Sequence, residues 1–170
     1  DVGPHIIFSK DKRILRWMVS MLGENKRKLY RRNVSYYKGR FVKYPFENGL
    51  HQLPKEDTFE CLYYFLKNDF TGPVKNFKDW MYAGFGKGIA EKYLIPYNKK
   101  IWKIDPSQMT LDWIGGRVPE PPPEDIIKSA LGIETEGYTL QLYFYYPLYG
   151  GVQSLVNNIL KKAKARKDLH

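Results

Sequence analysis

Three features that many proteins have are missing from this sequence of 170 residues. It has one cysteine, Cys61, so no internal disulfide can form, which fits a reducing compartment. Cys61 lies in a helical-looking apolar run, where a buried structural thiol is expected. No apolar run approaches the roughly 18 residues of a membrane span, and the start of the sequence lacks the basic and apolar regions of a signal peptide. The sequence therefore predicts a cytoplasmic protein without a membrane span.

The glycine patterns that hold phosphates are missing as well. The nearest is the run Gly84–Gly88, but Ile89 occupies the place where a dinucleotide-binding fingerprint requires its third glycine. The residues before this run read as helix rather than strand. Lys87 is followed by glycine rather than by serine or threonine, so the run is no P-loop either. His51 and His170 have no carboxylate or cysteine at metal-ligand spacing, and no metal site is predicted.

The sequence has few acidic residues relative to basic ones: it contains 18 Asp and Glu but 28 Lys and Arg, which gives a net charge of +10. Much of the excess lies in two clusters, residues 26–32 and 161–167. A positive surface favours anionic partners such as nucleic acids, acidic membranes and nucleotide-sugar diphosphates. Solvated surface lysines and a frayed tail are nevertheless the preferred explanation of both clusters. None of the usual nucleic-acid-binding motifs is present, so no specific nucleic-acid partner is predicted.

Turn and cap signals divide the chain into helices and strands without regular alternation, which predicts an α+β fold with a mainly antiparallel sheet. Lys38-Gly39 predicts a β-hairpin turn, Ser9 predicts a helix cap, and Pro96 predicts a helix end. Asp57-Thr58, with Glu60 placed for a capping box, predicts another helix start. The expected strands are residues 6–8, 31–37, 40–44 and 138–146, and the expected helices are residues 10–22, 57–67, 77–85, 86–94, 97–102, 124–131 and 152–160.

What the sequence does contain is an aromatic-rich segment, residues 93–119, that ends in a single arginine. Tyr97 and Trp102 can stack on a flat base or sugar face, and Arg117 can grip a diphosphate with two donors. Asp105 before Pro106 is interpreted as a turn or cap rather than as an acid catalyst.

This segment, together with Gly3-Pro4-His5 and the Tyr44-Pro45 pair, resembles the substrate domain of UDP-galactopyranose mutases and of their flavoprotein relatives, the amine oxidase and protoporphyrinogen oxidase group. The likeness covers most of the chain. It implies that residues 1–170 are a single substrate-binding domain excised from a larger FAD-binding protein. The missing flavin-binding domain would then hold most of the FAD, which this chain alone is not expected to retain.

The resemblance also implies roles for individual residues. Arg117 would bind the diphosphate of a nucleotide sugar, and Tyr97, Trp102 and Tyr138 would line the substrate cleft. The segment that contains Gly3, Pro4 and His5 would lie beside the flavin ring. From the residues alone, His5 is better explained as a buried histidine, and Trp113 as a core residue.

Two other functions stay open. The mutases have a second histidine three residues after the first, and this sequence has Phe8 there. The same fold could therefore serve a flavin-dependent amine oxidase or protoporphyrinogen oxidase-like oxidoreductase with a less charged substrate. The charge and the aromatic content also fit a basic nucleic-acid-binding module, although no motif supports it.

Overall fold

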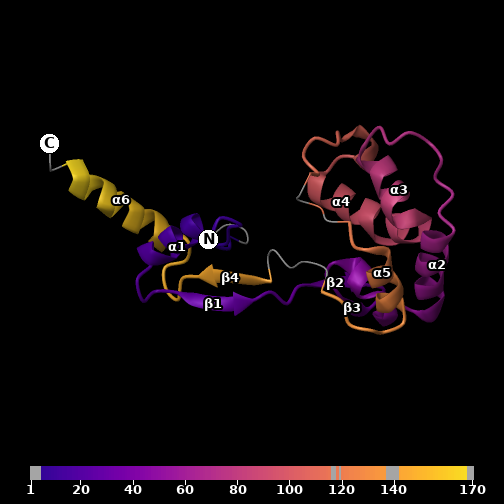
Figure 1. Ribbon diagram of the computed structural model, residues 1–170, viewed down its shortest axis with the longest axis horizontal. Coiled ribbons are helices and arrows are strands. Elements are labelled where there is room, and N and C mark those ends of the chain that lie inside the picture. The colour runs from indigo at the N-terminus through magenta and orange to yellow at the C-terminus, as the bar shows by residue number, and fades with distance from the viewer. Residues whose placement is uncertain (1–4, 116–117, 119, 137–141, 168–170) are drawn as a thin grey trace. The chain divides into compact units, whose positions relative to one another are not determined.

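The computed structural model describes residues 5–115, 118, 120–136 and 142–167. The chain forms two compact units: unit 1 consists of Asp1–Arg31 with Tyr138–His170, and unit 2 of Arg32–Gly137. Both contain helices and a small two-stranded antiparallel sheet (Figure 1), so the predicted α+β class is confirmed. Among the described helices, none combines the length and the apolar character needed to cross a bilayer.

Unit 1 joins two segments that are far apart in the sequence. Strand β1 pairs antiparallel with β4, and helix α1 packs against α6. Between them lies a small buried cluster of Ile7, Met21, Leu22 and Leu155. Around Ile7, the expected strand is reduced to an isolated bridge to Tyr145. The elements are α1 (Lys12–Met21), β1 (Arg27–Tyr30), β4 (Tyr143–Tyr146) and α6 (Gln153–Lys167).

Helix α1 is capped by a different residue from the one predicted. Asp11, not Ser9, accepts hydrogen bonds from the backbone N–H groups of Arg13 (2.7 Å) and Ile14 (3.3 Å). Ser9 instead accepts from the N–H of Asp11 itself. A carboxylate is the better cap here because it also interacts favourably with the helix dipole.

Unit 2 begins with the predicted hairpin, β2 (Val34–Tyr37) and β3 (Arg40–Lys43). Both turn residues have positive φ, 44° at Lys38 and 82° at Gly39, as a two-residue hairpin turn requires. One face of the hairpin turns inward and buries Val42.

The rest of unit 2 is helical, and two of its predicted boundaries are wrong. Helix α2 begins at Lys55 rather than at Asp57, with Pro54 at its N-cap position and no side-chain cap, so Asp57 lies in the first turn of the helix. Pro96 does not end a helix, because it lies in the first turn of α4, where its missing N–H costs little. The elements are α2 (Lys55–Leu66), α3 (Phe77–Ile89), a π-helical turn η3 (Ala90–Leu94), α4 (Ile95–Trp102) and α5 (Pro123–Ala130), with short 3₁₀ turns η1 (Phe46–Asn48), η2 (Leu50–Gln52) and η4 (Pro106–Gln108).

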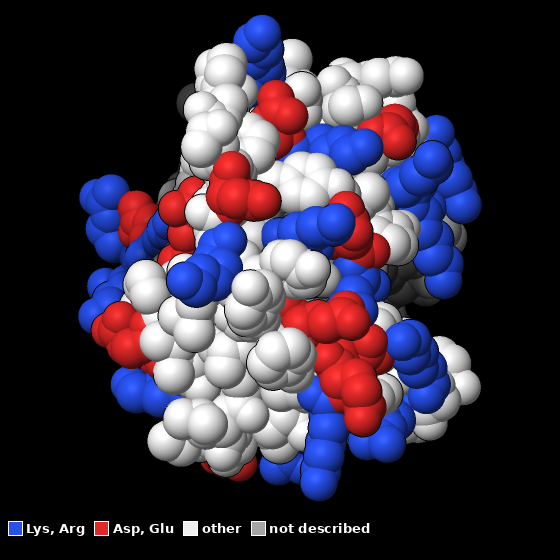
Figure 2. Space-filling view, turned by 90° about the vertical axis from the view of Figure 1, so that its right-hand side faces the viewer, with Lys and Arg blue, Asp and Glu red and all other residues white. Residues whose placement is uncertain are grey.

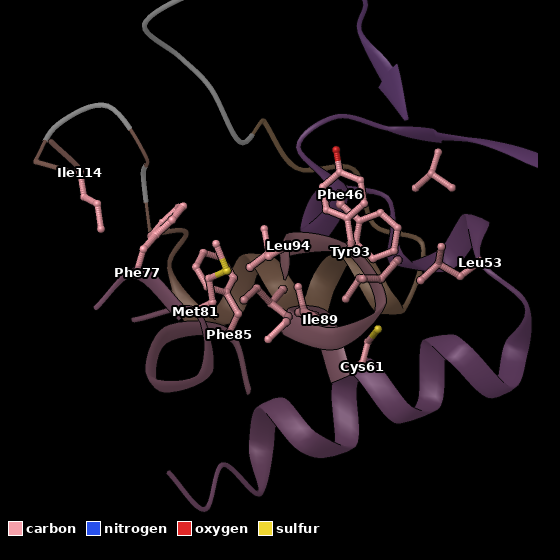
Figure 3. Close-up of a cluster of buried hydrophobic side chains, with 14 residues drawn as sticks. Phe46, Leu53, Cys61, Phe77, Met81, Phe85, Ile89, Tyr93, Leu94 and Ile114 are labelled. Carbon is pink, nitrogen blue, oxygen red and sulfur yellow. The ribbon is translucent and has the colours of Figure 1, made fainter. Parts of the chain in front are cut away.

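The core of unit 2 is aromatic and aliphatic, and α2, α3 and η3 supply most of it (Figure 3). Phe46, Phe77, Met81 and Phe85 are among its fully buried side chains. The Cys61 thiol is free and buried, and burial raises its pKa to about 12, so it stays protonated at neutral pH. The expectation of a structural thiol is confirmed.

Candidate functional site

Helix α4 (Ile95–Trp102) carries both aromatic residues that the sequence analysis assigned to a substrate cleft. It ends at Lys103, whose backbone is left-handed with φ of 57°. Asp105 then accepts hydrogen bonds within the next turn, which confirms that it is a cap. Tyr97 and Trp102 are therefore held on one short helix with a defined end.

Tyr97 belongs to a stack of rings drawn from three elements. Its ring stacks on Tyr93 at a centroid distance of 5.0 Å, and Tyr93 stacks on Phe46 at 4.3 Å with nearly parallel planes. Tyr44, which follows β3, lies 6.3 Å from Tyr97 at a tilt. The Tyr93 hydroxyl is hydrogen-bonded to Ser35 Oγ at 2.7 Å. Tyr97 is thus held by neighbouring rings and remains partly exposed.

Trp102 lies in a separate aromatic group. It meets Trp113 edge to face at 5.4 Å, and Trp113 meets the buried Phe77 at 4.8 Å. Its indole Nε1 donates to Asn98 Oδ1 at 3.2 Å. The residue is 50% exposed, so the face of the indole rather than its N–H is available for stacking. Trp102 and Tyr97 share a helix but have different ring neighbours.

Most of the other predicted site residues fall outside the part of the chain that the structure describes. Gly3, Pro4, Arg117 and Tyr138 lie outside the described residues, so their roles stay predictions. His5 is described and is exposed in unit 1, not buried. Among the described residues, the predicted substrate-binding residues are therefore Tyr97 and Trp102, and both lie on α4 of unit 2.

Trp113 is partly buried against the core, as its interpretation as a core residue requires. Its indole Nε1 is nevertheless buried without a hydrogen-bond partner in the described part of the chain. Sequence reasoning could not find this, because the burial of one atom depends on neighbours from other elements.

Glu47, on the short turn η1, is a buried acid that the sequence analysis did not single out. It is 5% exposed, and burial raises its pKa to about 7. Burial also raises the pKa of nearby Tyr93 to about 12, and the charges of Tyr97 and Glu47 add to this effect. Next to Glu47, the buried Asn48 has an Nδ2 group without a partner among the described residues. Of these buried polar groups, Glu47 is therefore the one whose pKa lies near neutrality.

A second charged cluster joins the hairpin turn to α2 and η3. The carboxylate of Asp57 accepts from Lys38 (2.8 Å), Lys92 (3.0 Å) and the Tyr37 hydroxyl (3.3 Å), and Lys92 also reaches Glu60 at 2.6 Å. Burial raises the pKa of Asp57, but the hydrogen bonds from the two lysines outweigh it and hold the pKa below its ordinary value. Every carboxylate and amine here has an internal partner, so the cluster is explained by its structural role.

The described residues form neither a dinucleotide-binding turn nor a metal site. The run Gly84–Gly88 lies inside and at the end of α3, and a Cβ at Gly88 would meet the backbone of α2 at 2.6 Å. These glycines allow two helices to pack closely and leave no cradle for a pyrophosphate. No group of three or more potential metal ligands occurs among the described residues.

Comparison with known proteins identifies the class of domain. No family model matches the chain. A solved structure of reduced UDP-galactopyranose mutase is similar to it, with a TM-score of 0.85 and 30% sequence identity over 95% of this chain. The match covers 36% of the mutase, so the chain spans about a third of that protein's length. The chain is therefore similar in sequence and fold to about a third of a UDP-galactopyranose mutase, and the predicted resemblance is confirmed.

Proposed function

We propose that this chain is the substrate domain of a FAD-dependent, UDP-galactopyranose mutase-like enzyme that acts on a nucleotide sugar in surface-polysaccharide biosynthesis. The likeness over 95% of the chain, at 30% sequence identity, carries the proposal. The FAD would be held by a flavin-binding domain outside this chain. The enzyme would work in the cytoplasm.

In this proposal the chain's own residues bind and orient the substrate. The exposed indole face of Trp102 stacks on the flat uracil base or on the sugar. The Tyr97 hydroxyl, with its ring fixed by Tyr93 and Tyr44, donates to a substrate oxygen. Arg117 provides the planar two-donor fork for the diphosphate, and Tyr138 completes the cleft. The positive net charge of +10 favours an anionic substrate.

Arg117→Ala in the complete enzyme is expected to weaken UDP binding by on the order of 2–4 kcal/mol, the range for a desolvated charge-assisted contact. Arg117→Lys should recover only part of this loss, because an ammonium group cannot reproduce the two-donor fork. Calorimetric titration with UDP measures both variants. Arg40→Ala, which removes an exposed arginine from the hairpin of the same unit, is the control and should bind UDP as the parent does.

One residue favours a second candidate function. Phe8 stands where the mutases have their second histidine, and its side chain can neither transfer a proton nor form a hydrogen bond. A flavin-dependent oxidase with a less charged substrate does not need that histidine. If the parent protein shows no affinity for UDP, or if Arg117→Ala binds UDP unchanged, the oxidase function replaces the mutase-like one.

A further inference from the structure

The positive charge of the protein is concentrated in one of its two units. Unit 1 contains 13 Lys and Arg against 4 Asp and Glu, a net charge of +9, whereas unit 2 contains 15 against 14, a net charge of +1. Figure 2 shows acidic and basic side chains intermixed on the face of the molecule that it draws. Solvated lysines spread evenly over a surface would not produce this division.

Helix α1 combines basic and large apolar side chains on its exposed surface. Ile14 and Trp17 are each 51% exposed, and as positions i and i+3 they lie on the same side of the helix. Arg13, one turn before Trp17, and Arg16 are also exposed. The opposite side of the helix packs into the unit 1 core. A half-exposed tryptophan among arginines is typical of side chains that insert at a membrane–water interface.

Helix α6 repeats this combination. Its inner side buries Leu155 in the same core, while Val156 and Leu160 are exposed one turn apart. Lys161 and Lys164, which lie in the turn of the helix after Leu160, are exposed as well. Asn158 Nδ2 donates to the carbonyl of Met21 at 2.8 Å, which fixes α6 to the end of α1.

We propose that the outer surfaces of α1 and α6, called the basic helix surface below, bind peripherally to a membrane that contains anionic lipids. Its lysines and arginines attract the lipid phosphates, and Ile14, Trp17, Val156 and Leu160 insert among the headgroups and upper acyl chains. A nucleic acid would satisfy the charge but would leave the aliphatic side chains without partners. Because the inference rests on charge division and exposure in unit 1, it does not depend on the proposed function.

Co-sedimentation of the full chain with lipid vesicles tests this proposal. We expect binding to phosphatidylcholine vesicles that contain phosphatidylglycerol, little binding to pure phosphatidylcholine, and a steep loss of binding with added salt. Lys161→Gln with Lys164→Gln should weaken binding by roughly tenfold or more, since each basic side chain near an anionic surface contributes about a fivefold factor. Lys55→Gln with Lys67→Gln removes the same charge from exposed positions at the two ends of α2 and should change binding far less.

Trp17→Ala tests the apolar contribution separately and should weaken vesicle binding severalfold without changing its salt dependence. Phe59→Ala, which removes an exposed aromatic residue from α2, is its control. Circular dichroism checks that each variant keeps its helices. The proposal is overturned if the vesicles do not bind the chain, if each pair of variants weakens binding equally, or if a DNA duplex of arbitrary sequence binds where the anionic vesicles do not.

Discussion

Gly88→Ala is expected to destabilise unit 2 by about 3 kcal/mol, the upper end of the usual cost of overpacking in a rigid interior. A Cβ at this position would lie 2.6 Å from the carbonyl oxygen of Glu60 and 2.7 Å from the Cα of Cys61. Both atoms belong to the backbone of α2, so no side-chain rotation can relieve the contact. The two helices would have to move apart and open the core between them.

Gly84→Ala is the matched control, because it adds the same methyl group to the same helix. No atom lies within 4 Å of the added Cβ at Gly84, and alanine is the better helix former. We expect this variant to be about 0.5–1 kcal/mol more stable than the parent. Urea denaturation followed by circular dichroism measures both. Equal stabilities of the two variants would contradict the close packing of α2 against α3.

Glu47 is expected to make the protein about 3 kcal/mol less stable at pH 8 than near pH 4.5. Burial raises its pKa to about 7 from an ordinary value of 4.5, so the folded protein binds a proton that the unfolded chain releases. This contribution is fully present below the unfolded pKa and is lost as pH rises through the folded value. Asp57 has a lowered pKa, so the stability that it contributes is lost only as the pH falls into the more acidic range.

Glu47→Gln should remove this pH dependence, because an amide keeps the shape of the carboxyl group and does not titrate. Urea denaturation of parent and variant at about pH 5 and pH 8 gives the comparison. The variant should be the more stable protein at pH 8. If the stability difference between parent and variant stays the same at both pH values, Glu47 does not titrate in this range.

Local signals predicted part of this fold well. Lys38-Gly39 predicted the hairpin turn because the φ angles of two residues decide such a turn. The position of Tyr97 and Trp102 on a short helix also followed from the sequence. The helix cap predicted at Ser9 was wrong because a second cap residue, Asp11, lies two positions later. The helix end predicted at Pro96 was wrong because the π-helical turn η3 leads directly into α4, and Pro96 lies in its first turn.

The rest depends on contacts between residues far apart in the sequence. Asp57 meets Lys38 and Lys92, which come from other elements, and no local pattern indicates that pairing. The same holds for the burial of Glu47 and for the contact between Gly88 and α2. Residue chemistry suggested Tyr97, Trp102 and Arg117 as binding residues, and family resemblance gave them and Tyr138 their roles. The structure describes Tyr97 and Trp102, both on α4, whereas Arg117 and Tyr138 lie outside the described residues.

The most direct test of a nucleotide-sugar substrate domain is a titration of the ¹⁵N-labelled chain with UDP, followed through the indole N–H signals of its four tryptophans. We predict that the Trp102 signal shifts in a saturable way at UDP concentrations up to the order of millimolar. Trp17, which lies in unit 1, should stay unchanged and serves as the internal control. No shift at Trp102, or a shift at Trp17 alone, would contradict the assignment of α4 to a nucleotide-sugar site.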